Sequence, residues 1–184
     1  MSNYEDLHAQ YARLCRRLND LDSIMAPPCD AGVHRAMNDL REQIAKIARE
    51  IQARPIEVRE LIESTAGPLP GQRLIVAEIH DTASGQLFTL RHPGGEEVGR
   101  FSREALDTMT FTRHGKWSGK GEVPAIGSEV LVHMNGFGLA TVVAHEVVEG
   151  WLGLIVSFHV PPDWYLRQNQ GVNRPGLVFG AEIR

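Results

Sequence analysis

The residues with the most evident capacity for chemistry form a short basic run between two strand-like segments. The run covers 113–121, RHGKWSGKG, and its candidate nucleic-acid-binding residues are Arg113, His114, Lys116, Trp117 and Lys120. Glycines let a backbone approach a ligand, cations contact phosphates, and a tryptophan can stack on a base. The run is not a Walker loop, because Gly121 and not serine or threonine follows Lys120. It indicates either a nucleic-acid-binding loop or a flexible polar connection, and we favour the connection.

A second set of residues has the composition of a protein-binding surface. Residues 161–165, PPDWY, follow an apolar segment, and the prolines restrict the backbone ahead of two large aromatic rings. Tryptophan and tyrosine are enriched among the residues that dominate binding energy at interfaces. We expect Phe137, Trp151, Trp164 and Tyr165 to line a shared partner-binding groove. The alternative is that Trp164 closes the end of a small barrel as part of its core.

Neither metal binding nor nucleophilic catalysis has a recognisable pattern in the sequence. His133, His145 and His159 lie in or near strand-like segments, but there is no HExxH, no HxH and no cysteine pair at metal-ligand spacing. There is no GxSxG motif, and neither Cys15 nor Cys29 has a catalytic context. We therefore expect no metal, no cofactor and no enzymatic activity, unless residues scattered along the chain assemble a site.

Length and composition limit the class of protein further. The chain has 184 residues, of which 42% are apolar, enough for a core in one domain or in two small ones. Its net charge of −4 argues against a protein that binds nucleic acid over its whole surface. The polar N-terminal segment does not resemble a signal peptide, and no run approaches the ~20 apolar residues of a membrane span. With two cysteines in all, these features predict a cytoplasmic protein without membrane association.

The N-terminal part has the apolar spacing of a coiled-coil-like helical hairpin. Ser2 and Glu5 match a capping box at the start of the first helix. Apolar residues then follow at intervals of three and four, namely Leu7, Tyr11, Leu14, Leu18, Leu21 and Met25. Pro27 and Pro28 end this helix, Asp30 would cap the second, and the short link favours an antiparallel pair.

The second helix continues the same pattern and is expected to be the longer of the two. Its apolar residues are Met37, Leu40, Ile44, Ile47 and Ile51, with the phase continuing past Pro55 to Val58 and Ile62. In a pair of helices, the apolar stripe of each helix packs against the other helix. Because the second stripe is longer, part of it would have to pack against the β region or against another copy of the chain. We expect a homo-oligomer with an interface formed by Ile44, Ile47, Ile51, Val58 and Ile62.

A linker separates the arm from a strand-rich region. Serine, glycine and proline dominate residues 64–71, so we place a helical arm at 1–63 and an antiparallel β domain at 72–184. The fold class is therefore α+β, and a fragment that begins at Gly71 should fold without the arm.

The β domain has two strand-rich halves, 72–113 and 123–184, and the sequence leaves open whether they form one sheet system or two barrels. The second half contains a V-x-V segment at 130–132, the turn-and-strand GFGLATVV at 136–143, and an apolar segment at 151–158. This order resembles the SH3-like and Tudor-like small β-barrels. The resemblance implies a small barrel that binds peptides, modified side chains or nucleic acid, although the aromatic cage of such modules cannot be assigned to residues here.

Three classes of function fit these features. We favour a non-enzymatic adaptor or inhibitor that binds a protein partner through the coiled-coil-like arm and the aromatic-bearing β domain, such as a mobile-element accessory protein that blocks a host complex. The second class is a nucleic-acid-associated module that uses the basic glycine-rich loop. The third is an enzyme of unrecognised type. Salt dependence separates the first two, because phosphate-driven affinity falls steeply with salt.

Overall fold

The computed structural model describes residues 4–24, 31–109 and 111–184 and shows an α+β protein, in which two long helices precede a strand-rich region that contains two short helices. It divides into two compact units, Met1–Pro55 and Ile56–Arg184. Several residues named above lie outside the described part of the chain, namely Ser2, Met25, Pro27, Pro28, Cys29 and Asp30.

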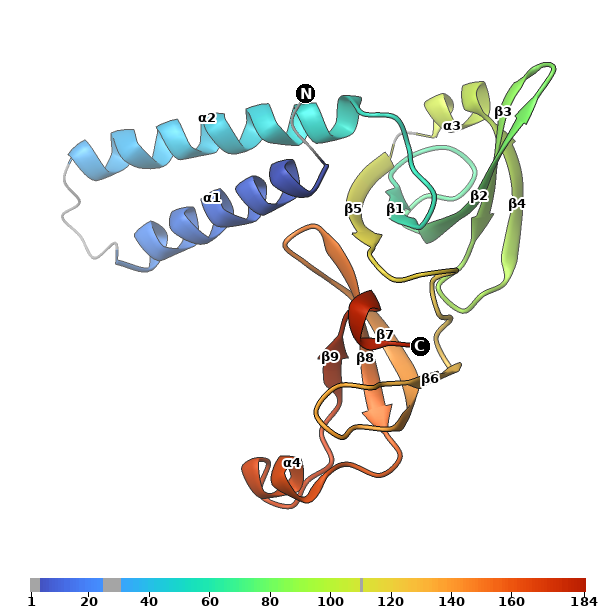
Figure 1. Cartoon of the computed structure of the whole chain (residues 1–184). Coiled ribbons are helices and arrows are strands. Elements are labelled where there is room, and N and C mark those ends of the chain that lie inside the picture. The colour runs from blue at the N-terminus through green and yellow to red at the C-terminus, as the bar shows by residue number, and fades with distance from the viewer. Residues whose placement is uncertain (1–3, 25–30, 110) are drawn as a thin grey trace. The chain divides into compact units, whose positions relative to one another are not determined.

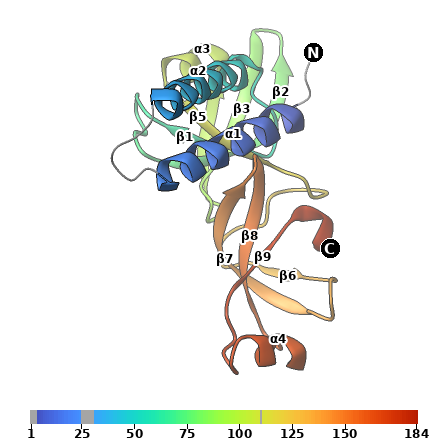
Figure 2. The same ribbon diagram turned by 90° about the vertical axis from the view of Figure 1, so that its left-hand side faces the viewer.

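The first unit is the expected pair of antiparallel helices, α1 (Tyr4–Ile24) and α2 (Ala31–Ala53), which lie side by side in both ribbon views (Figures 1 and 2). Leu7 of α1 and Ile47 and Ile51 of α2 form a buried cluster, with Tyr11 and Leu14 packed against it. The intervals of three and four therefore place the apolar side chains of each helix on the face that contacts the other.

The extension of this helical pattern to Val58 and Ile62 is wrong. Helix α2 ends at Ala53, just before Pro55, which lacks the backbone N–H that a helix needs. Ile62 lies in a strand and is fully buried in the second unit, whereas Val58 is half-buried before that strand.

The proposed oligomer interface loses its basis with this correction. Ile47 and Ile51 are 8% and 4% exposed and already form the hairpin's own cluster, so they are not available to another copy. Ile44 is half-buried, Val58 and Ile62 belong to the other unit, and Ile62 is fully buried there.

The second unit consists of a mostly antiparallel sheet and two short helices. Its strands are β1 (Glu60–Ser64), β2 (Arg73–Thr82), β3 (Gly85–Arg91), β4 (Glu97–Ser102), β5 (Phe111–Trp117), β6 (Glu129–Leu131), β7 (Leu139–Val148), β8 (Trp151–Phe158) and β9 (Gly176–Val178). Its helices are α3 (Arg103–Thr108) and α4 (Asp163–Gln168), and a 3₁₀ turn, η1, spans Gly180–Glu182.

These strands form one sheet in the order β4-β3-β2-β1-β5-β8-β7-β6, with β9 paired to β8. The sheet is not closed on itself, so the SH3-like barrel suggested by the sequence is not confirmed. An isolated bridge between Val132 and Ile183 brings the last described residues beside the end of β6.

Strand β1 lies in the interior of the sheet, between β2 and β5. Residues 64–71 are therefore not a linker between domains: they form the connection from β1 to β2, where Ser64 N–H donates to Gln72 O at 3.0 Å and Gly71 N–H donates to Ser64 O at 2.7 Å. The boundary between the compact units lies earlier, between Pro55 and Ile56. A glycine- and proline-rich turn has the same composition as a linker, which explains the error.

The two strand-rich halves belong to one sheet system. They join where β5 pairs in parallel with β8, with Lys116 opposite Trp151 and Trp117 opposite Leu152. One buried cluster crosses this junction, because Leu61 of β1 packs in the same group as Trp117 and the inner residues of β7 and β8. A second cluster, which includes Phe88 and Leu90, fills the first half alone.

A buried ion pair holds β5 to β1. Arg113 Nε donates to Glu60 Oε1 at 2.6 Å, and Arg113 Nη2 donates to Glu60 Oε2 at 2.5 Å. The two side chains are 2% and 0% exposed, and Glu57 N–H also donates to Glu60 Oε2 at 3.1 Å. This bidentate geometry compensates two charges removed from water, and loss of either partner would leave the other charge buried and uncompensated.

Removal of one member of this ion pair should strongly destabilise the β unit. We expect Arg113→Met to lower the free energy of unfolding by about 3–5 kcal/mol, because it leaves the Glu60 carboxylate buried without its cation. Arg103→Gln is a matched control: its ion pair with Asp107 is exposed, and its loss should cost about 0–1 kcal/mol. Urea unfolding measures both, and equal stability of the two variants would contradict the assigned role.

The position of β1 also sets the limits of the fragment that should fold alone. A fragment of residues 56–184 keeps β1 and should unfold cooperatively on heating. A fragment that begins at Gly71 loses an interior strand together with Leu61 and Ile62, which are 1% and 0% exposed, so it should be insoluble or show no transition. Circular dichroism melting compares the two, and a cooperative transition in the shorter fragment would show that β1 is dispensable.

Candidate functional site

Three of the four aromatic residues expected to bind a partner lie together: Trp164 and Tyr165 belong to α4, and their rings meet that of Phe137. Helix α4 follows β8 in the chain (Figure 1). The ring of Phe137 stacks on Phe158, with 4.0 Å between the centroids. Trp164 and Tyr165 each meet Phe137 edge-on, at centroid distances of 5.5 and 5.1 Å. We call Phe137, Phe158, Trp164 and Tyr165 the aromatic cluster. Since Phe158 is only 3% exposed, the cluster is continuous with the buried core.

Trp164 is the most exposed ring of the cluster, at 36%. Its indole nitrogen donates to Asn135 O at 3.2 Å, while the Tyr165 hydroxyl donates to Arg174 O at 2.9 Å. Edge-on ring pairs contribute about 0.5–1.5 kcal/mol beyond the area they bury, so these contacts hold Trp164 in one orientation. Trp164 is thus neither a buried plug nor a freely rotating surface residue.

Local sequence explains why these rings meet. Pro162 precedes the first residue of α4, and its carbonyl accepts hydrogen bonds from Tyr165 N–H and Leu166 N–H at 2.9 and 3.1 Å. On the other side, Asn135 and Gly136 have φ angles of 52° and 78°, the left-handed region that asparagine and glycine tolerate best. This turn presents the Asn135 carbonyl to Trp164.

Trp151 does not belong to this cluster, so the expected four-residue groove is wrong in that respect. It lies at the beginning of β8, whereas Phe158 is at the end of the same strand. Sequence reasoning missed Phe158, which reads as an ordinary core residue of an apolar strand. It also missed two exposed apolar residues that lie close in the chain to rings of the cluster: Val160, 81% exposed, follows Phe158 by two residues, and Leu139, 43% exposed, follows Phe137 by two.

The basic run is not a free cationic loop, because carboxylates face three of its four basic residues. Arg113 is in the buried pair with Glu60, and Lys116 Nζ donates to Glu57 Oε2. His114 Nε2 lies 3.1 Å from Glu63 Oε2. All three carboxylates come from β1 and the residues just before it, some fifty to sixty positions away in the chain, so no local signal in the run reveals them.

Trp117 is a core residue rather than a stacking platform. It is 2% exposed, and Gly119 packs so closely over its indole that a Cβ added to Gly119 would lie 2.6 Å from the ring. Lys120 is the exposed residue among the five candidates of the basic run. The structure therefore does not bring these five residues together as a nucleic-acid-binding surface.

The histidines that drew attention in the sequence have separate surroundings. His159 Nε2 lies 2.8 Å from Thr141 Oγ1, His145 Nε2 lies 2.8 Å from Pro124 O, and His133 lines a cavity described below. Within residues 4–24, 31–109 and 111–184, no three histidine, cysteine or carboxylate side chains are grouped closely enough to hold a metal ion.

Comparison with known proteins adds no family assignment: no protein-family model matches the chain, and no curated protein matches it significantly. Among the described helices, none combines the length and the apolar character that crossing a membrane requires.

His145 should make stability depend on pH. Burial lowers the pKa of this imidazole, only partly opposed by the hydrogen bond to the Pro124 carbonyl. The unfolded chain therefore takes up a proton near pH 6.5 that the folded chain resists, and stability should fall as pH drops below about 6.5. Above that value His145 is neutral in both states and contributes no pH dependence.

Urea unfolding at pH 7.5 and 5.5 tests this expectation. His145→Gln should reduce the difference in stability between the two pH values, because the variant has no imidazole to protonate at this position. His80→Gln is the control, since His80 is an exposed residue beside Glu78. If the two variants show the same pH dependence as the unmodified protein, the role assigned to His145 is wrong.

Proposed function

We propose that the protein is a non-enzymatic adaptor or inhibitor that binds a protein partner through the aromatic cluster. The observation that carries this proposal is the geometry of Trp164: a ring 36% exposed, packed edge-on against Phe137 and Tyr165, and hydrogen-bonded to Asn135 O. Because the contacts already orient the Trp164 side chain, it loses little conformational entropy when a partner covers it. Buried tryptophan anchors contribute about 2 kcal/mol or more at interfaces.

The surroundings of the aromatic cluster favour a protein partner. Val160 and Leu139 add exposed apolar area next to residues that contact the cluster, and apolar area of this kind is stabilised by burial against another protein. The residues at its edge are polar or charged, including Asn135 and Asp163. An apolar centre with a polar rim is the usual anatomy of a protein–protein interface.

Nucleic-acid binding is the weaker alternative. Phosphate contacts require cations that are not already compensated, and Glu57, Glu60 and Glu63 compensate the basic run from within the same unit. We keep the similarity to SH3-like and Tudor-like modules as part of this proposal. In it, the segment 132–138 and α4 form the part of the β unit that contacts the partner. The helical hairpin would offer a second docking surface.

Affinity capture from the source cells, followed by identification of the bound protein, tests the proposal. We expect Trp164→Ala to weaken the affinity for that partner about thirtyfold, which corresponds to the loss of about 2 kcal/mol. The variant should remain folded, and the loss of two edge-on ring contacts should lower its free energy of unfolding by about 1–3 kcal/mol. Ile126→Ala is the matched control, since Ile126 is an apolar residue of similar exposure, 40%, that makes no ring contact with the cluster.

Two results would count against this placement of the site. One is a folded Trp164→Ala protein that retains full affinity for the partner. The other is capture of nucleic acid, with an affinity that falls steeply between 50 and 200 mM salt, which is the behaviour of phosphate-driven binding.

A further inference from the structure

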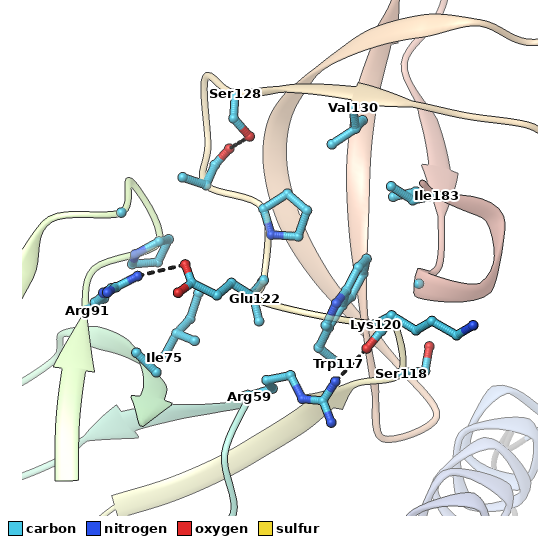
Figure 3. A pocket seen from close by; sticks show the side chains of 18 of the residues that line it. Arg59, Ile75, Arg91, Trp117, Ser118, Lys120, Glu122, Ser128, Val130 and Ile183 are labelled. Carbon is cyan, nitrogen blue, oxygen red and sulfur yellow. Dashed lines mark hydrogen bonds and ion pairs between the residues drawn. The ribbon is translucent and has the colours of Figure 1, made fainter. Parts of the chain in front are cut away.

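The β unit contains a cavity of about 880 Å³ that none of the aromatic cluster lines (Figure 3). Its walls come from Arg59 just before β1, from β2, from the end of β3 and the segment after it, from residues within 117–133, and from residues within 180–184. This volume lies within the range of about 300–1,000 Å³ that is typical of sites for small organic molecules. The cavity is therefore large enough for a ligand and is separate from the proposed protein-binding surface.

The lining combines cationic and apolar side chains. Its charged residues are Arg59, Arg91, Lys120, Arg184, Glu122 and Glu129, so cationic side chains outnumber carboxylates four to two. Figure 3 shows Arg59 and Arg91 on the side formed by the first half of the sheet, with Val130 and Ile183 across from them. Such an arrangement suits a ligand that is charged at one end and apolar at the other.

Arg59 has a backbone conformation that calls for an explanation. Its φ is 68°, in the left-handed region, which is unfavourable for a residue with a side chain and costs glycine little. Two backbone hydrogen bonds fix this conformation, from Arg59 N–H to Val76 O at 2.7 Å and from Trp117 N–H to Arg59 O at 3.0 Å. What arginine adds at this strained position is its guanidinium group, which donates to Gly119 O at 2.6 Å in the cavity wall.

Arg91 offers a second guanidinium whose present partner can be exchanged. Its Nη1 donates to Glu122 Oε2 at 2.9 Å, and the two side chains are 30% and 71% exposed. An ion pair this exposed contributes little to stability, because water screens it. An acidic group of a ligand could therefore replace the Glu122 carboxylate at little cost.

We propose that this cavity binds a small organic anion. Its carboxylate or phosphate group is recognised by the guanidinium groups of Arg59 and Arg91, whose planar donors suit either acid. Its apolar part lies against Val130 and Ile183, across the cavity from these two arginines (Figure 3). Glu122 competes with the ligand for Arg91, which lowers the affinity of the native protein for any anion.

Calorimetric titration with matched probes tests the proposal on the full chain. The probes are 1-naphthylacetate, 1-naphthyl phosphate and the neutral 1-naphthalenemethanol, which share an apolar ring system and differ in the head group. We expect at least one of the two anions to bind with a dissociation constant on the order of 1 mM or tighter, and the neutral alcohol to bind at least about tenfold more weakly. The two anionic probes distinguish a carboxylate ligand from a phosphate ligand.

Three variants give a pattern of effects that a purely structural role would not produce. Arg59→Gly removes the guanidinium and relieves the left-handed strain, and Arg91→Gln removes the second cation; each should weaken anion binding about tenfold. Glu122→Gln removes the competing carboxylate and should strengthen binding several-fold. Arg103→Gln, outside the cavity, should leave affinity unchanged.

The proposal is overturned if neither anion binds, if the neutral alcohol binds as tightly as the anions, or if Glu122→Gln weakens binding. It is also overturned if the anion affinity is the same in Arg59→Gly and Arg91→Gln as in the unmodified protein. Arg91→Gln keeps the test decisive if Arg59→Gly fails to fold, because Arg91 lies in a half-exposed pair and not in the core. Failure here leaves the protein-binding proposal intact, since Trp164 lies elsewhere.

Discussion

The buried ion pair between Glu60 and Arg113 is the constraint on which the β unit depends. It joins β1 to β5 through two short charge-assisted hydrogen bonds at a place that water does not reach. Two buried charges are costly unless each compensates the other, so the pair tolerates little variation in how the two strands meet. Its consequence is a fixed position for β5, the strand that leads from the first half of the sheet to the second.

Trp117, the last residue of β5, packs in the same buried cluster as the apolar residues of β8. Two residues later, Gly119 packs closely against the indole of Trp117. A side chain on Gly180 would collide with the backbone of Gly119, so two glycines allow the end of the chain to pack directly against this turn. These close approaches form one wall of the cavity that contains Arg59 and Arg91. The far end of β8 supports the aromatic cluster through Phe158, so a single strand connects the junction of the two halves to the proposed protein-binding surface.

Charge compensation decides between the functional classes that the sequence leaves open. Carboxylates from β1 and the residues just before it face Arg113, His114 and Lys116 of the basic run, and of these three only Arg113 is buried. The two arginines assigned to the anion, Arg59 and Arg91, lie outside that run, in a strained turn and at the end of β3, although Lys120 of the run also lines the cavity. Protein binding through Trp164 and anion binding in the cavity are therefore separate proposals that rest on separate residues.

The sequence by itself determined the α+β class and the helical hairpin, and it predicted that Phe137, Trp164 and Tyr165 would lie together. These features depend on apolar periodicity and on residue types that can be recognised in short segments of the chain. It assigned Ile62 to a helix, residues 64–71 to a linker and the basic run to a loop. The first two assignments failed because β1 is short and is a strand only through its pairing with β2 and β5, so the turn after it has the composition of a linker. The third failed because residues 113–117 belong to β5, which pairs with β1 and β8. Tertiary structure alone decided that Glu60 would meet Arg113 and that Arg59 and Arg91 would line one cavity, because these contacts join residues whose separation in the chain carries no local signal.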